Sequence, residues 1–125
     1  AVLQQFRSSV TVGIHVRYKH QTEVAYLRFP PRSYFEQSMR SFRLKHKAVK
    51  FVVASDDPVW CSKQSIFQDP DVHVLAERSM PALDMAILVG CDHMITTVGS
   101  FGWWAAYLGA DAKGGEVLWT SDSDL

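Results

Sequence analysis

The sequence lacks the features of a membrane-spanning, N-glycosylated or nucleic-acid-binding segment. No run approaches the roughly 18 apolar residues that a membrane helix needs, and the opening residues AVLQQF carry no charged region with a cleavage site. Asparagine is absent, so the chain offers no N-glycosylation acceptor. The 13 basic and 13 acidic residues are interspersed and give a formal net charge of zero. We therefore expect no nucleic-acid partner and no membrane contact by this segment.

Cysteine is scarce, and neither cysteine nor histidine shows the spacing of a metal site. Cys61 and Cys91 permit one disulfide but do not require it, so both states stay open. The five histidines, at positions 15, 20, 46, 73 and 93, have no metal-ligand spacing. The sequence therefore predicts neither a metal ion nor a cofactor.

Segments with a strand pattern alternate with segments with a helix pattern along the whole chain. Strands are expected at residues 10–17, 51–54, 71–76, 93–98 and 116–119, and helices begin near residues 33, 81 and 101. This alternation is typical of an α/β domain with a Rossmann-like, mostly parallel sheet and helices on both faces. Because 125 residues with 47% hydrophobic content suit one core, we expect a single domain over residues 1–125.

The first strand carries an apolar face and a face with reactive side chains. Its alternation places His15 and Arg17 on the same side, near the carboxyl end of the strand. Asp56 directly follows the second strand, whereas Asp57 and Pro58 suit a helix start and so have a structural explanation. Open α/β sheets bind ligands at the carboxyl ends of their strands, so we expect His15, Arg17 and Asp56 to lie together there.

A glycine-bounded turn, GSFG at residues 99–102, joins the fourth strand to the last helix. Backbone N–H groups at a helix start attract anions, the Ser100 hydroxyl adds a donor, and glycine allows a ligand to approach the main chain. The pattern predicts a phosphate seat at Ser100, Phe101 and Gly102, and an ordinary strand-to-helix connection is the alternative. Asp84 lies in the first turns of the preceding helix, where a carboxylate either complements the helix dipole or binds a ligand.

Two further expectations concern the helices themselves. Ser33 and Glu36 have the S-x-x-E spacing of a capping box, which predicts the start of a helix with Phe35, Met39 and Phe42 on its inner face. In the helix after Pro81, the expected packing side is formed by Leu83, Ala86, Ile87 and Gly90.

These residues together describe a pocket that suits a nucleotide. One arginine with oriented N–H groups suits a diphosphate, while a carboxylate suits a sugar hydroxyl or the N–H edge of a base. The first strand leads into RYKHQ, so the G-x-G-x-x-G fingerprint is absent, and no G-x-x-x-x-G-K-[ST] loop occurs either. The sequence predicts nucleotide binding without either common motif.

Three blocks of the sequence resemble the α1,2-fucosyltransferase family. They are VGIHVR at 12–17, FVVASDDPVWC at 51–61 and, most specifically, DMAILVGCDHMITTVGSFGWWAAYL at 84–108. The H-x-R element is also similar to that of α1,6- and protein O-fucosyltransferases. The resemblance covers nearly the whole chain and implies the GDP-fucose-binding half of a GT-B-like, metal-independent, inverting glycosyltransferase. It further implies a galactoside-terminated glycan as acceptor and a Golgi enzyme, lumenal and held by a type II membrane anchor outside this segment.

The resemblance also implies roles for individual residues. Arg17 would hold the β-phosphate with His15 beside it, Asp84 would contact the guanosine, and Ser100, Phe101 and Gly102 would complete the diphosphate site. Asp56 is assigned to the same donor site from its position at the end of the second strand. An arginine and helix N–H donors can stabilise the negative charge that grows on the β-phosphate as fucose leaves.

The chain departs from the family after the H-x-R element. Where the family reads H-x-R-R-x-D, this sequence has His15-Val16-Arg17-Tyr18-Lys19-His20, so the second arginine and the aspartate are replaced. Lys19 restores a positive charge but not a planar fork. Glu23, in the local context T-E-V-A, resembles a glutamate of the α1,6 relatives that could deprotonate the acceptor, and solvation of a loop glutamate is the alternative.

Three interpretations follow from the sequence. The first is a fucosyltransferase that moves fucose from GDP-fucose to a galactose hydroxyl, of which this chain is a fragment lacking the acceptor-side, N-terminal half. The second is a diverged domain that binds GDP or a nucleotide sugar without turnover. The third is an unrelated nucleotide-binding α/β domain.

Overall fold

The computed structural model describes residues 9–17, 31–75, 81–97 and 100–119, and these form an α/β domain around one parallel sheet. The strands are β1 (Val10–Val16), β2 (Val49–Ser55), β3 (Val72–Val74), β4 (His93–Ile95) and β5 (Val117–Leu118). Their order in the sheet is β3-β2-β1-β4-β5, and all four pairings are parallel. The predicted fold class is confirmed, although β3, β4 and β5 are each shorter than the sequence pattern suggested.

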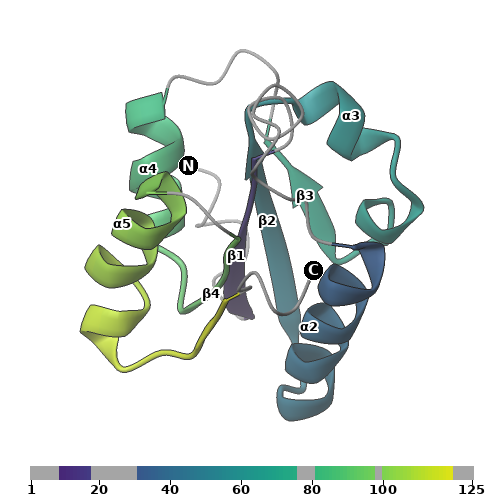
Figure 1. Ribbon diagram of the computed structural model, residues 1–125. Coiled ribbons are helices and arrows are strands. Elements are labelled where there is room, and N and C mark those ends of the chain that lie inside the picture. Colours follow the sequence, from purple (N-terminus) through teal and green to yellow (C-terminus); the bar gives the residue numbers. More distant parts are fainter. Residues whose placement is uncertain (1–8, 18–30, 76–80, 98–99, 120–125) are drawn as a thin grey trace.

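Helices cover both faces of this sheet (Figure 1). They are α2 (Arg32–Lys45), α3 (Pro58–Ser62), α4 (Pro81–Val89) and α5 (Ser100–Leu108), with short 3-10 helices η2 (Ser65–Phe67) and η3 (Asp111–Lys113). Figure 1 shows α4 and α5 side by side on one face and α2 on the other. None of the helices in the described ranges is long and apolar enough to cross a membrane.

The strand order places a reversal at the centre of the sheet. The chain builds outward from β1 through β2 to β3, then returns to the other side of β1 to form β4 and β5. We call the edge at which the parallel strands end the carboxyl edge, and the opposite one the amino edge. In open α/β sheets ligands bind in a crevice at a reversal of this kind, outside the carboxyl ends of the strands. We use the word crevice for this region at the carboxyl ends of β1 and β4.

The core consists of two clusters separated by the sheet. Val12, Ile14 and Phe51 pack against Phe35 and Phe42 of α2 on one face. On the other face, a second cluster includes Val52, Leu88, Met94, Ala105 and Ala106. The inner face predicted for α2 is therefore confirmed.

Both faces of β1 are buried, which corrects the expected contrast between an apolar face and an accessible one. Thr11 and His15 are buried although they lie on the side expected to be open. Gly13 between them has room for no side chain, since a Cβ there would lie 2.9 Å from Leu88 and 3.1 Å from the Met94 sulfur. A parallel sheet covered by helices on both faces requires this second buried face.

Two predictions about helix ends and faces were wrong and one is confirmed. No side chain caps α2, whose N-cap is Pro31, and Glu36 instead accepts a hydrogen bond from Arg32 Nε at 2.6 Å. Among the described side chains of α4, those of Asp84 and Leu88 are buried; of the predicted packing residues, Ile87 is partly buried against the core, whereas Leu83 is 54% exposed. Asp57 does cap α3, because its carboxylate accepts the Trp60 N–H at 3.1 Å.

The two cysteines lie in different core clusters and are not joined. Cys61 belongs to the cluster on the α2 face and Cys91 to the cluster on the α4 and α5 face, and both are free thiols. Burial raises the pKa of Cys61 to about 11 and that of Cys91 to about 12. Both are therefore protonated, unreactive core side chains at neutral pH.

Candidate functional site

The carboxyl end of β1 brings His15 and Arg17 to the crevice at the centre of the sheet. In the β1–β2 register, His15 stands opposite Ala54 and Val16 opposite Ser55, so the next residues, Arg17 and Asp56, leave the sheet side by side. His15 is buried and Arg17 is half-buried. The expected convergence of strand ends at one edge is confirmed by this register.

Burial keeps the His15 side chain neutral. It lowers the pKa of His15 to about 4, an effect that the nearby Asp56 carboxylate partly opposes and the Arg17 guanidinium reinforces. At neutral pH the positive charge at this strand end therefore belongs to Arg17, and His15 is an uncharged part of the wall.

The first turn of α5 packs directly against this strand end. A Cβ at Gly102 would overlap the Thr96 Oγ1 atom and would lie 3.2 Å from His15 Nδ1, so glycine allows the helix to approach β1 and β4 this closely. The first N–H groups of a helix have no partner within it and carry the positive end of the helix dipole. The backbone at Ser100, Phe101 and Gly102 thus begins a helix at the crevice, as predicted, while the side chains of Ser100 and Phe101 lie outside the described set.

Asp84 lies at the same edge, in the first turns of α4. The helices α4 and α5 lie alongside each other, because a Cβ at Gly109 would be 2.7 Å from the Val89 backbone at the end of α4. Each helix follows a parallel strand and starts at the carboxyl edge, so Asp84 is near the start of α5. Asp84 is only 7% exposed and has an interaction of its own.

Asp56 and Asp57 differ in role: one caps a helix and the other lies at the crevice. Asp57 caps α3 and also donates its N–H to Ser55 Oγ at 2.9 Å. Asp56 is half-buried and close enough to His15 to influence its pKa. The described contacts therefore give Asp57 a structural role and place Asp56 at the crevice.

Two residues at the end of β4 were missed by the sequence analysis. Thr96 and Thr97 are 0% and 2% exposed, and they stand where β4 ends beside β1. The Thr96 hydroxyl contacts the Thr97 carbonyl at 3.4 Å, whereas the Thr97 hydroxyl is buried without a hydrogen-bond partner. Adjacent threonines between a buried strand and a glycine turn are the signal that could have drawn attention to them.

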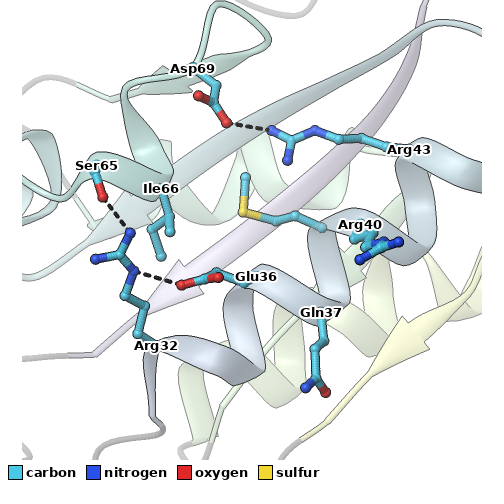
Figure 2. A pocket seen from close by; sticks show the side chains of 9 residues that line it. Arg32, Glu36, Gln37, Arg40, Arg43, Ser65, Ile66 and Asp69 are labelled. Atoms are coloured by element: carbon cyan, nitrogen blue, oxygen red, sulfur yellow. Dashed lines mark hydrogen bonds and ion pairs between the residues drawn. The ribbon is translucent and has the colours of Figure 1, made fainter.

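A hollow away from this edge is a different feature. A groove of about 450 Å³ lies between α2 and η2. Figure 2 shows the arginines and carboxylates among the side chains that line it. Arg32 binds Glu36 and Ser65, and Arg43 binds Asp69 at 3.2 Å. Arg32 and Arg43 are thus paired with acidic side chains, and none of the predicted site residues lines the groove.

Some predictions concern parts of the chain that the described ranges do not include. Glu23, the candidate base, and the replaced positions Tyr18 and His20 all lie outside them. Across residues 9–17, 31–75, 81–97 and 100–119, no three His, Cys, Asp or Glu side chains form a group that could hold a metal.

Comparison with known proteins identifies relatives among the fucosyltransferases. A family model described as glycosyl transferase family 11 matches residues 3–118. Galactoside alpha-(1,2)-fucosyltransferase 1 of Sus scrofa is 36% identical over 142 residues, covering 99% of this chain and 36% of the relative. Galactoside 2-alpha-L-fucosyltransferase SEC1 of Bos taurus is 35% identical over 95% of this chain and 33% of its own length. Galactoside alpha-(1,2)-fucosyltransferase 1 of Homo sapiens is 34% identical over 95% of this chain and 33% of its own length. The chain thus spans about a third of the length of these relatives.

Proposed function

The chain belongs to glycosyl transferase family 11, and on this basis we propose that it is the donor-binding domain of a fucosyltransferase that uses GDP-fucose. One observation supports the proposal: the end of β1 that carries His15 and Arg17 lies beside the first turn of α5, where a Cβ at Gly102 would be 3.2 Å from His15 Nδ1, and this is where the strand order reverses. A diphosphate requires a planar cation and oriented N–H donors at one place. Asp56 and Asp84 provide carboxylates at the same edge for hydroxyl or N–H groups of the nucleotide sugar.

The proposed reaction is a direct displacement with inversion. A galactose hydroxyl oxygen bonds to C1 of fucose while the bond from C1 to the β-phosphate oxygen breaks, and the bonding electron pair leaves with GDP. The hydroxyl proton passes to a base, for which Glu23 is the candidate. Arg17 and the first N–H groups of α5 would stabilise the charge that grows on the leaving β-phosphate, without a divalent metal.

The remaining elements of the proposal concern the whole protein. We infer a galactoside as acceptor from the names of the relatives. We propose that the acceptor side is formed by further sequence of a longer, GT-B-like enzyme in the Golgi lumen, anchored as a type II membrane protein.

Calorimetric titration with GDP tests the donor site on this chain. We expect wild type to bind GDP and Arg17→Ala to bind about 10- to 100-fold more weakly, the usual loss for a charge-assisted hydrogen bond. Arg40→Ala is the matched control, because Arg40 is exposed on α2 and should leave the affinity unchanged. Equal affinities of wild type and Arg17→Ala would contradict the assignment of Arg17.

A transfer assay separates this proposal from a binding domain without turnover, which the replaced residues Tyr18 and His20 favour. A longer protein that carries this chain is incubated with labelled GDP-fucose and a β-galactoside. A fucosylated product supports the enzyme. GDP binding that depends on Arg17, with neither transfer nor donor hydrolysis, supports the second function.

A further inference from the structure

The Thr97 hydroxyl is an unusual polar group, located two residues after the end of β4. Across the described residues, it is the one buried side-chain oxygen or nitrogen without a hydrogen-bond partner. Thr97 is only 2% exposed, so water does not replace the missing partner at the surface. Leaving a buried hydroxyl unpaired costs about 1–3 kcal/mol, and such groups in folded proteins call for an explanation.

The other buried threonines show that this is not a general property of the chain. Thr11 donates its hydroxyl to Asp92 Oδ2 at 3.2 Å and accepts the Asp92 N–H at 3.1 Å. Thr96, one residue before Thr97, contacts a carbonyl at 3.4 Å. The unpaired hydroxyl is therefore confined to the last threonine before the turn into α5.

Its place in the fold indicates what could supply the partner. Thr97 follows β4 at the strand reversal, and α5 begins three residues later at Ser100. The first N–H groups of α5 and the Arg17 guanidinium both attract an anion to this end of the sheet. Rotation about the single Cα–Cβ bond exchanges the hydroxyl and the methyl of a threonine, so a small movement can redirect the donor.

We propose that Thr97 is a positioning residue whose hydroxyl donates to a phosphate oxygen of the bound nucleotide diphosphate, so that a group unpaired in the free protein becomes paired on binding. This inference rests on the proposed function, since it assigns one more contact to the same donor site. A phosphate oxygen suits the role better than a base or sugar atom, because a charged acceptor forms the stronger hydrogen bond with a shielded donor.

The test uses Thr97→Val, which replaces the hydroxyl by a methyl of similar size, and measures stability and binding separately. Without ligand, Thr97→Val should melt at or up to about 5 °C above wild type, because it removes an unpaired buried hydroxyl. With GDP, its affinity should fall about tenfold or more, whereas affinity for guanosine, followed by NMR titration, should stay unchanged. Thr97→Ser, which keeps a hydroxyl, should bind GDP within about threefold of wild type.

Thr11→Val is the matched control, since Thr11 is also buried, at the amino edge, but fully partnered. It should melt below wild type and keep its GDP affinity. The inference is overturned if Thr97→Val binds GDP like wild type, loses GDP and guanosine alike, or melts clearly below wild type, or if Thr97→Ser fails to retain binding. A wild-type chain that does not bind GDP overturns the proposed donor site and this contact with it, which distinguishes that failure from loss of Thr97 alone.

Discussion

The two edges of the sheet use polar groups in opposite ways. At the amino edge, hydrogen bonds of backbone and side chain join Thr11 to Asp92, and the Glu116 N–H donates to His93 Nδ1 at 2.8 Å. At the carboxyl edge, burial keeps His15 uncharged, and the Thr97 hydroxyl is shielded without a partner. At the amino edge the polar groups thus hydrogen-bond to one another and join the strands. At the carboxyl edge at least one polar group lacks a partner, which a bound ligand could provide. Stability and binding should therefore respond to mutations at different edges.

The largest effect is expected from Gly115→Ala at the amino edge. A Cβ there would overlap the Asp92 carbonyl oxygen and lie 3.2 Å from the Ala110 carbonyl, and backbone atoms cannot move aside easily. We expect the free energy of unfolding in urea to fall by about 3 kcal/mol. GDP affinity of the protein that remains folded should not change.

The neighbouring glycine provides the control for that substitution. Gly114 has φ of 78°, but a Cβ added there would meet no atom within 4 Å, so alanine is strained without a collision. Gly114→Ala should lower stability by only about 1 kcal/mol. Equal losses at the two glycines would show that the close approach to Asp92 is not what Gly115 is needed for.

Acidification should weaken the carboxyl edge more than the amino edge. The folded-state pKa of His15, about 4, lies below its ordinary value of 6.5, so the unfolded chain binds more protons between these pH values. Stability should therefore fall as the pH is lowered through this window, by about 2 kcal/mol from this residue between pH 7 and pH 5. Denaturant unfolding of wild type and His15→Gln at the two pH values measures the difference.

His93 is the comparison residue for this experiment. Its pKa is also lowered, by burial and by the nearby His46, but the side chain is only partly buried. His93→Gln should therefore remove less of the pH dependence than His15→Gln. If His93→Gln removed more of the pH dependence than His15→Gln, the histidine that burial keeps uncharged would be the one at the amino edge.

Substitution of Asp92 measures how much the hydrogen bonds of the amino edge contribute to the free energy of unfolding. It accepts hydrogen bonds from the Thr11 N–H at 2.9 Å and from the Thr11 hydroxyl at 3.2 Å. Asp92→Ala leaves both donors without this acceptor and should lower the free energy of unfolding by about 1.5 kcal/mol. Asp92→Asn keeps one acceptor oxygen and should recover part of that loss; if it unfolds as easily as the alanine variant, charge rather than hydrogen bonding holds this edge.

The sequence was sufficient for the features that depend on local pattern. Alternating strands and helices predicted the parallel sheet, and Asp57-Pro58 predicted the start of α3 correctly. The convergence of Arg17 and Asp56 followed from a general property of parallel sheets and is confirmed by the register.

The features that failed have different causes. The capping box of Ser33 and Glu36 does not form, because α2 already begins at Arg32 and Glu36 pairs with Arg32 one turn away. The buried side of α4 includes Asp84 instead of Leu83, which depends on contacts with distant segments. Whether a threonine hydroxyl finds a partner depends on which strand ends beside it, so the sequence could draw attention to the adjacent threonines but could not show that the Thr97 hydroxyl is unpaired. The sheet order, with β4 next to β1, had to be known first.

The smallest effect is expected from the ion pair that is most visible at the amino edge. Lys45 Nζ lies 2.7 Å from Glu116 Oε1, but the two side chains are 49% and 36% exposed. Exposed pairs contribute little because water and salt screen them, so Lys45→Met, which keeps the apolar stem, should change the free energy of unfolding by less than about 0.5 kcal/mol. A double-mutant cycle with Glu116→Gln, measured at low and high salt, isolates the pair. A coupling above about 1 kcal/mol that persists in high salt would show that the amino edge is held by charge as well as by its buried hydrogen bonds.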